Sequence, residues 1–358
     1  MAQKFRVMVV DDSAFMRKLI TDLISEDPEF QVVYAANNGR EALERIAEIQ
    51  PDVITMDIEM PEMNGLEALK AIMQCHPVPV IMLSSYADEA ARETIMALEL
   101  GAVDFIRKPS GSISLDLYSV KNTLIEKLKI AVETRVKSIS FEHTGVVETK
   151  AAKAQISLTE PIRQIVAIGT STGGPRALQQ VLSRIPALIP APILIVQHMP
   201  PKFTKSLAQR LDSSCEVHVV EAQDGESVKA GTVYIAPGGS HMKLVRHAGE
   251  LRIQLTLEEA RNGHRPSVDV LFESLIPLGG LIKHVVLMTG MGSDGAKGMK
   301  ALKDAGAVTT IAESEETAVV YGMPRSAVEL GCVTDLLPLQ HISKKIMDSV
   351  MSHQRPEP

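Results

Sequence analysis

The sequence predicts an α/β protein of two domains, each a doubly wound parallel sheet. Short apolar runs alternate with helical patterns over residues 1–125, and the same alternation restarts near residue 161. Strands that alternate with helices pair in parallel, because each helix carries the chain back across the sheet. The chain has 358 residues, which is too long for one ordinary core. Polar residues follow the strands at their carboxyl ends, where the ligand site of such a sheet lies.

Composition narrows the class of protein. Hydrophobic residues make up 45% of the chain and charged residues 23%, which is typical of a soluble globular protein. The formal net charge of -7 argues against nucleic acid as a partner. Three widely spaced cysteines, Cys75, Cys215 and Cys332, suggest a reducing compartment and no zinc site. The N-terminus lacks a signal-peptide layout and no apolar run could span a bilayer, so we expect a cytoplasmic protein without membrane insertion.

The first domain is predicted to hold five strands separated by helical patterns. The expected strands are Arg6–Val10, Gln31–Ala35, Pro51–Met56, Val78–Leu83 and Val103–Arg107. The clearest helical patterns between them are Ala14–Ser25 and Arg40–Ile49. A long helical pattern, Leu115–Val136, closes the domain, and residues 126–160 are expected to form the end of this helix and a flexible linker.

Five polar residues follow these strands at the carboxyl edge of the predicted sheet: Asp11, Asp12, Asp57, Ser84 and Lys108. Three carboxylates brought together repel one another unless a hard cation such as Mg²⁺ binds between them. A lysine and a serine beside them can contact a phosphoryl group, and a carboxylate can accept one as a nucleophile. Taken singly, each residue could also be a solvated loop residue or a helix cap; Asp12 is an example.

Residues 1 to about 125 resemble a two-component receiver domain, through VVDDS, MDIEMPEMNG, LSS and RKPS in this order. The resemblance implies Mg²⁺-dependent phosphotransfer from a histidine kinase of the chemotaxis system. By motif it assigns phosphorylation to Asp57, metal binding to Asp11, Asp12 and Asp57, the switch pair to Ser84 and Phe105, and a phosphoryl contact to Lys108.

The second domain is predicted to begin around the motif IVAIGTSTGGP at Ile165–Pro175. An apolar strand ends in a glycine-flanked turn, and Pro175–Ile185 has helical spacing. Gly173 and Gly174 permit positive φ angles in this turn. The arrangement places Ser171 at the tip of a helix, where it could act as a nucleophile or where the amides could hold a phosphate.

Further strands of the second domain are expected after this motif in the chain. They are Ala191–Val196, Gly231–Ala236, His284–Met288, Val308–Ala312 and Val319–Tyr321, with an antiparallel hairpin of Met242–Arg246 and Leu251–Leu257. We therefore expect a second, Rossmann-like sheet beside a small hairpin.

Three strand ends of the second domain present Ser171, His198 and Asp294. A serine hydroxyl becomes a good nucleophile when an imidazole takes its proton and a carboxylate holds the imidazole in the right tautomer. The order of the three along the chain differs from that of α/β-hydrolases. Two other loop histidines, His241 and His264, remain alternatives for the base.

The motifs GTSTGGP, QHMPPKFT, YIAPGGSHM, HRPSVDVLF, TGMGSDGAKGM and VVYGMPR resemble the chemotaxis protein-glutamate methylesterase family over nearly all of residues 161–350. The resemblance implies hydrolysis of glutamate methyl esters on methylated chemoreceptor cytoplasmic domains and deamidation of receptor glutamines. It implies activation by phosphorylation and no cofactor in the catalytic domain, expected at 161–352. By motif, Ser171, His198 and Asp294 are catalytic, and backbone amides at Thr172 and Met291 hold the oxyanion.

One serine and three arginines of the second domain stand apart from these assignments. Ser293 stands where many members of the family carry asparagine, so its side chain is given no role. The substrate is a partly anionic helical receptor, so Arg176, Arg261 and Arg265 are candidates for docking it.

Two other functions compete with the esterase. GTSTGGP could cradle the phosphates of a nucleotide without catalysis, although Pro175 and Arg176 stand where a P-loop would carry its lysine. A DNA-binding response regulator is disfavoured by the net charge and by the absence of a compact helix-turn-helix pattern.

Overall fold

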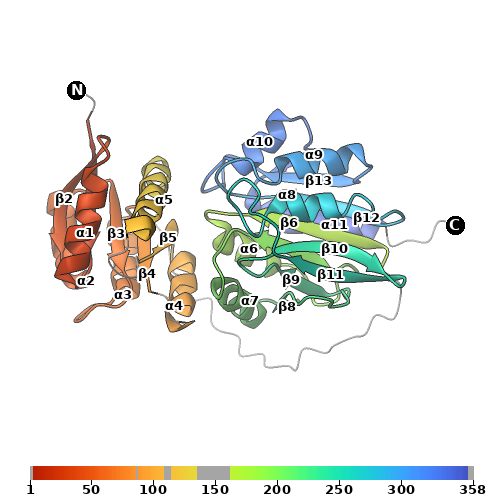
Figure 1. The fold of residues 1–358 in the computed structure, drawn as a ribbon, viewed down its shortest axis with the longest axis horizontal. Coiled ribbons are helices and arrows are strands. Elements are labelled where there is room, and N and C mark those ends of the chain that lie inside the picture. The colour runs from red at the N-terminus through yellow and green to blue at the C-terminus, as the bar shows by residue number, and fades with distance from the viewer. Residues whose placement is uncertain (1–2, 86–87, 109–113, 135–161, 354–358) are drawn as a thin grey trace. The chain divides into compact units, whose positions relative to one another are not determined.

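A computed structural model describes residues 3–85, 88–108, 114–134 and 162–353 of the chain. Contacts divide the chain into two compact units, Met1–Val146 and Val147–Pro358, and each is described by itself (Figure 1). In the described parts of the chain, every helix is too short or too polar to cross a membrane.

The first unit is a five-stranded sheet in the order β2-β1-β3-β4-β5, with all neighbours parallel. Its strands are β1 (Phe5–Val10), β2 (Phe30–Ala36), β3 (Val53–Asp57), β4 (Val80–Ser84) and β5 (Asp104–Arg107). Every residue of β3 and β4 is buried, which explains their near-continuous apolar sequence. This strand order is that of flavodoxin-like proteins and confirms the predicted fold of the first domain.

Five helices cover the two faces of this sheet. They are α1 (Ala14–Ser25), α2 (Gly39–Ile49), α3 (Gly65–Cys75), α4 (Asp88–Glu99) and α5 (Ser114–Glu133). Helix α1 packs against α5, while α2, α3 and α4 form the other layer. Ser13 caps α1, since its side chain accepts from the Met16 N–H, and Asn64 forms a capping box with Glu67 at the start of α3.

The second unit is a seven-stranded parallel sheet in the order β14-β13-β12-β6-β7-β9-β8. Its strands are β6 (Gln164–Thr170), β7 (Ile193–Gln197), β8 (His218–Glu221), β9 (Thr232–Ile235), β12 (Ile282–Leu287), β13 (Thr309–Glu313) and β14 (Asp335–Leu337). The chain leaves β6 toward β7 on one side and returns to pair β12 on the other. The strand order therefore reverses at β6, and ligand sites of such sheets lie at this kind of switch point.

Helices lie on both faces of the second sheet, and a separate hairpin packs on one of them. The helices are α6 (Gly174–Leu182), α7 (Phe203–Ser214), α8 (Val268–Ser274), α9 (Ala296–Asp304), α10 (Met323–Glu329) and α11 (Leu339–Ser352). Helix α6 packs against α7 and α11, whereas α8 packs against α9 and the hairpin of β10 (His241–His247) and β11 (Glu250–Thr256). The Rossmann-like sheet with a small hairpin is thus confirmed.

The predicted elements differ from the structure in three respects. The strand expected at Val319–Tyr321 is wrong, because this segment is a loop with one isolated bridge, from Tyr321 to Gly290. The edge strands β8 and β14 were not expected. Helix α5 ends at Glu133, and Val136 and most of the predicted linker lie outside the described residues.

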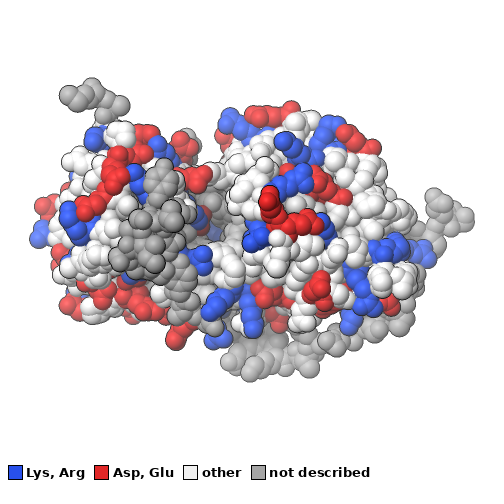
Figure 2. All heavy atoms as spheres, viewed as in Figure 1, with Lys and Arg blue, Asp and Glu red and all other residues white. Residues whose placement is uncertain are grey.

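Acidic and basic side chains are interspersed over both units on the face shown in Figure 2. This mixture agrees with a modest net charge of -7. A single-sign basic field, which would favour a nucleic-acid partner, is not seen among the described residues of that face.

Candidate functional site

The carboxyl edge of the first sheet gathers the carboxylate cluster, defined here as Asp11, Asp12 and Asp57. Asp11 follows β1, Asp57 ends β3, and both are buried, whereas Asp12 is exposed. One oxygen of each lies within 4.8 Å of the others. Lys108 follows β5 and bridges two of them, with Nζ 2.8 Å from Asp11 Oδ2 and 2.6 Å from Asp57 Oδ2.

Burial affects the protonation of Asp57 and of Lys108. It raises the pKa of Asp57 to about 6, although Lys108 and the Ile58 N–H partly offset the effect. Burial also disfavours the Lys108 ammonium, but its pairs with Asp11 and Asp57 outweigh this and raise its pKa. Lys108 therefore stays charged and partly neutralises the cluster.

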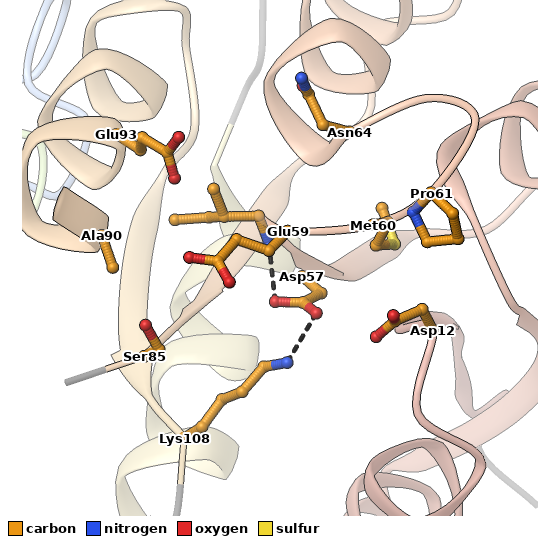
Figure 3. Close-up of a pocket in the computed structure, with 11 residues that line it drawn as sticks. Asp12, Asp57, Glu59, Met60, Pro61, Asn64, Ser85, Ala90, Glu93 and Lys108 are labelled. Carbon is orange, nitrogen blue, oxygen red and sulfur yellow. Dashed lines mark hydrogen bonds and ion pairs between the residues drawn. The ribbon is translucent and has the colours of Figure 1, made fainter. Parts of the chain in front are cut away.

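A cavity of about 640 Å³ opens over the cluster and is lined by Asp12, Asp57 and Lys108 together with residues of α4 and the loop after β3. Figure 3 shows the Asp57 carboxylate pointing toward the Lys108 ammonium, with Asp12 on one side of it and Glu59 and Glu93 on the other. Hard carboxylate oxygens at this spacing, beside an open cavity that admits water, fit the ligand preference of Mg²⁺. The donor set is therefore suitable for the predicted metal.

The expected switch pair is buried in the sheet edge beside this cavity. The hydroxyl of Ser84 lies 2.8 Å from that of Thr94 on α4, and Thr94 also lies 2.6 Å from the Ala90 carbonyl. Phe105 is 6% exposed, and the Lys127 ammonium lies 5.4 Å from its ring centre. Ser84 thus contacts α4, while its neighbour Ser85 lines the cavity.

In the second unit, Ser171 occupies the turn between β6 and α6. Its N–H donates to the Thr289 carbonyl at 3.0 Å, and its carbonyl accepts from Gly174 at 2.8 Å. Gly173 has a φ of 78°, a backbone conformation that explains why this position of the turn is a glycine. Gly174 serves a different purpose, since a Cβ there would lie 1.9 Å from the Gln197 side-chain oxygen. The Ser171 hydroxyl makes no hydrogen bond to any described residue.

Backbone contacts bring the end of β7 beside Ser171. His198 donates its N–H to the Thr170 carbonyl at 3.1 Å. The Gln197 side chain accepts from the Thr170 hydroxyl at 2.6 Å and donates to the Ser171 carbonyl at 2.9 Å. Gln197 was not predicted as part of the site, although it directly precedes His198. It locks the two strand ends together.

Asp294 lies in the loop between β12 and α9 and contacts the imidazole of His198. His198 Nε2 is 2.8 Å from Asp294 Oδ2, and both side chains are almost fully buried. The other ring nitrogen, Nδ1, is buried and has no hydrogen-bond partner among the described residues. The structure thus pairs the predicted histidine and carboxylate and leaves one ring nitrogen available.

The surroundings of Asp294 favour its ionised form. Burial opposes ionisation, but hydrogen bonds from His198, the Val268 N–H and the Ser267 hydroxyl outweigh it and lower the pKa of Asp294 to about 2. The Val268 N–H and the Ser267 hydroxyl both belong to the N-terminal end of α8, where Ser267 is the cap. Ser267 was not predicted in the site, because its motif indicates only a helix start.

The two alternative histidines have other contacts. His241 is buried and uses both ring nitrogens, one toward the Glu259 carbonyl and one accepting from the Ser267 N–H. His264 stacks on His198, with ring centres 3.8 Å apart and planes 7° apart. Burial, aided by His198, lowers the pKa of His264 to about 4. Neither arrangement favours these histidines over His198 as a base.

The expected oxyanion donors lie in two segments, Thr172 in the turn after β6 and Met291 in the loop after β12. The Thr172 carbonyl accepts from the Thr289 hydroxyl at 2.9 Å, which ties the turn after β6 to the loop after β12. Met291 lies two residues beyond Thr289, and its N–H donates to no described residue. Ser293 in the same loop is exposed, which agrees with giving its side chain no role.

Two of the three candidate docking arginines have intramolecular partners. Arg261 makes a bidentate contact with Glu273, and Arg265 donates to the carbonyls of Leu257 and Glu258. Arg176 is exposed at the start of α6 and pairs with no acid of the described residues. The docking role of Arg176 stays a prediction.

Both units of the chain match known protein families. Residues 166–346 match the family model "CheB methylesterase", and residues 7–117 match "Response regulator receiver domain". The chain is 51% identical to the protein-glutamate methylesterase/protein-glutamine glutaminase of Geobacillus kaustophilus, covering 96% of this chain and 98% of the relative. It is 47% identical to the protein of the same name from Archaeoglobus fulgidus, covering 96% and 97%.

A solved structure gives the same result for the second unit. The crystal structure of the Thermotoga maritima CheB methylesterase catalytic domain is 46% identical, with a TM-score of 0.50, and covers 52% of this chain and 98% of that one. The predicted resemblance is confirmed at nearly full length. The chain belongs to the CheB methylesterase family, with a response regulator receiver domain preceding the methylesterase domain.

Proposed function

We propose that the chain removes methyl groups from glutamate methyl esters of chemoreceptors and deamidates receptor glutamines, through an acyl-enzyme on Ser171. The observation that supports this most directly is the 2.8 Å contact from His198 Nε2 to Asp294. An ionised Asp294 can only accept, so Nε2 carries the hydrogen and Nδ1 keeps its lone pair. That lone pair can take the Ser171 proton.

The steps follow from these roles. Ser171 Oγ attacks the ester carbonyl while His198 Nδ1 takes its proton, and Asp294 stabilises the imidazolium. The N–H groups of Thr172 and Met291 hold the oxyanion. His198 then returns the proton to the leaving methoxy oxygen, and methanol departs. Water then attacks the glutamyl-enzyme while His198 takes its proton, and His198 returns this proton to Ser171 Oγ as the glutamate is released. For a glutamine substrate, ammonia leaves in place of methanol.

The receiver is proposed to regulate this reaction. Asp57 accepts a phosphoryl group from the histidine kinase of the chemotaxis system. Asp11, Asp12 and Asp57 would hold the Mg²⁺ ion. The bound ion would neutralise the carboxylates and the phosphoryl oxygens. Lys108 contacts the phosphoryl group, and Ser84 with Phe105 reads it. A thousandfold activation corresponds to about 4 kcal/mol of differential stability between two states.

The boundaries proposed for these functions are 1–125 for the receiver, 126–160 for the helix end and linker, and 161–352 for the catalytic domain. Family membership favours the esterase over a nucleotide-binding module, whose only support is the glycine turn itself.

The proposal is tested on methylated receptor fragments incubated with the full-length chain. Intact mass of the receptor should show conversion of methyl ester to acid, and rapid acid quenching should trap a receptor adduct on the peptide containing Ser171. The Ser171→Ala chain should give neither. An adduct on any other residue, or conversion that persists in this variant, would overturn the assignment.

Activation is tested by comparing the wild type with Asp57→Asn, each with and without acetyl phosphate and Mg²⁺. The wild-type rate should rise on phosphorylation, while the variant should keep the basal rate under both conditions. Equal activation of both chains would exclude Asp57 as the phosphorylated residue.

A further inference from the structure

Glu313 is a buried carboxylate that takes no direct part in the proposed reaction. It ends β13 and is 0% exposed. Oε2 accepts from the Thr289 N–H at 2.8 Å, and Oε1 accepts from the Thr317 hydroxyl at 3.0 Å. Among the described residues it has no ion pair with Lys, Arg or His, so these hydrogen bonds are what offset its desolvation.

Thr289 connects this carboxylate to the nucleophile. Its carbonyl accepts from the Ser171 N–H at 3.0 Å. Its hydroxyl donates to the Thr172 carbonyl at 2.9 Å and accepts from the Val320 N–H at 3.0 Å. Every polar group of Thr289 is therefore engaged, and one residue links Glu313 to both Ser171 and Thr172.

Gly290, the residue after Thr289, is packed so closely that Thr289 has little room to move. A Cβ on Gly290 would lie 2.8 Å from Ser171 Cβ and 2.2 Å from Met323 Sδ. The Gly290 carbonyl also accepts from the Met323 N–H at 2.8 Å. Met291, whose N–H is a proposed oxyanion donor, follows directly. A shift of Thr289 would therefore move both the nucleophile and this donor.

We propose that Glu313 is a positioning residue, which fixes Thr289 and thereby aligns Ser171 with the Met291 N–H. This inference deepens the proposed esterase function and rests on it. What Glu313 supplies is a hydrogen-bond acceptor at one place, not a charge. Burial raises the pKa of Glu313 to about 7, and the neutral acid keeps a carbonyl oxygen that can accept from Thr289.

The test compares four full-length variants with the wild type. Glu313→Gln keeps an acceptor oxygen of the same reach, and Glu313→Leu removes it at similar volume. Thr310→Val is the matched structural control. Thr310 lies on the same strand, is fully buried and donates to the Cys332 carbonyl at 2.6 Å, with no hydrogen bond to Thr289 or Ser171. Ser171→Ala reports whether release depends on the proposed nucleophile.

Methanol release from methylated receptor is measured over a range of receptor concentrations, below the temperature at which any variant begins to unfold. Glu313→Leu should lower kcat on the order of 10²-fold with KM unchanged, since misplacement of reacting groups by about 1 Å has this effect. Glu313→Gln should restore kcat close to the wild-type value, and Thr310→Val should leave it unchanged despite its lower stability.

Three results would overturn the inference: a wild-type kcat in Glu313→Leu, an equal loss in Thr310→Val, or no rescue by Glu313→Gln. Should Glu313→Leu not fold, Glu313→Asp withdraws the acceptor by one methylene group and carries the same expectation. Failure of the esterase proposal itself is distinguishable, because the wild type would then show no Ser171-dependent release at all.

Discussion

The imidazole rings of His198 and His264 stack in parallel, with 3.8 Å between their centres and 7° between their planes. The turn that presents His264 is braced from both sides, because Arg261 and His264 exchange backbone hydrogen bonds and Arg261 also pairs with Glu273. The stack fixes the plane of His198 while Asp294 fixes one edge of its ring. Together, the stack and the Asp294 contact determine the direction in which Nδ1 points, although neither contact involves Nδ1 itself.

Two replacements of His264 should separate the effect of its ring stacking on His198 from any effect of its own protonation. His264→Phe keeps an aromatic ring on His198 and should retain most of kcat. His264→Ala removes the stack, which is worth about 0.5–1.5 kcal/mol for an aromatic pair, so kcat should fall by up to about tenfold. Steady-state methanol release checks this, and an alanine variant as fast as the wild type would show that the stack does not orient the base.

The carboxylate of Asp294 should be needed for catalysis far more than for folding. Asp294→Asn presents the wrong hydrogen-bonding partner to His198 Nε2 and should lower kcat on the order of 10⁴-fold, as in serine proteases. The chain offers a matched control in Asp212, which lies 3.0 Å from His218 Nδ1. Asp212→Asn should leave kcat unchanged, and a comparable loss there would indicate a general effect of breaking Asp–His pairs.

Glu313 should make the stability of the second unit depend on pH. Its pKa is raised from 4.5 to about 7, so between these values the unfolded chain loses a proton that the folded chain keeps. Stability is therefore lost as pH rises through about 7, by about 3 kcal/mol at 1.36 kcal/mol per pH unit. Glu313→Gln should remove this loss. Denaturant unfolding at pH 5 and pH 8 measures it, and identical pH dependence of both chains would contradict it.

Mg²⁺ binding to the receiver should weaken as pH falls. Burial raises the pKa of Asp57 to about 6, and a metal requires the ionised carboxylate. Mg²⁺ must then displace a proton below about pH 6, and affinity should fall as pH decreases through this value. Titration calorimetry at pH 5 and pH 8 checks this in wild type and in Asp57→Asn, in which the difference arising from Asp57 should disappear. A wild-type affinity independent of pH would rule out Asp57 as a titrating ligand.

Much of the fold was predictable because buried strands and amphipathic helices leave periodic patterns. Helix α1 begins and ends where the pattern predicts, and β1 differs by one residue. The strands that were missed are short edge elements. β8 has one fully buried residue in four and β14 has none in three, so neither carries a continuous apolar run. Tyr321 has strand-like neighbours, but its segment is fixed by contacts with the loop after β12.

Only the site residues that directly follow strands could be predicted from the sequence. Ser171, His198 and Asp294 follow strands that the topology brings to one edge, and the pairing of His198 with Asp294 follows from that rule. The contacts that hold this pair in place could not be predicted from the same rule. Ser267 caps α8 and Glu313 ends β13, and their hydrogen bonds to Asp294 and Thr289 join segments far apart in the chain, which no local period records.

The most direct test of the proposed chemistry is release of radiolabelled methanol from methylated chemoreceptor by the full-length chain, wild type against Ser171→Ala, with folding of both verified by circular dichroism. Release by the wild type that vanishes in the folded variant is the expected result. Equal release by both chains would contradict an acyl-enzyme on Ser171, and no release by either would contradict the esterase function.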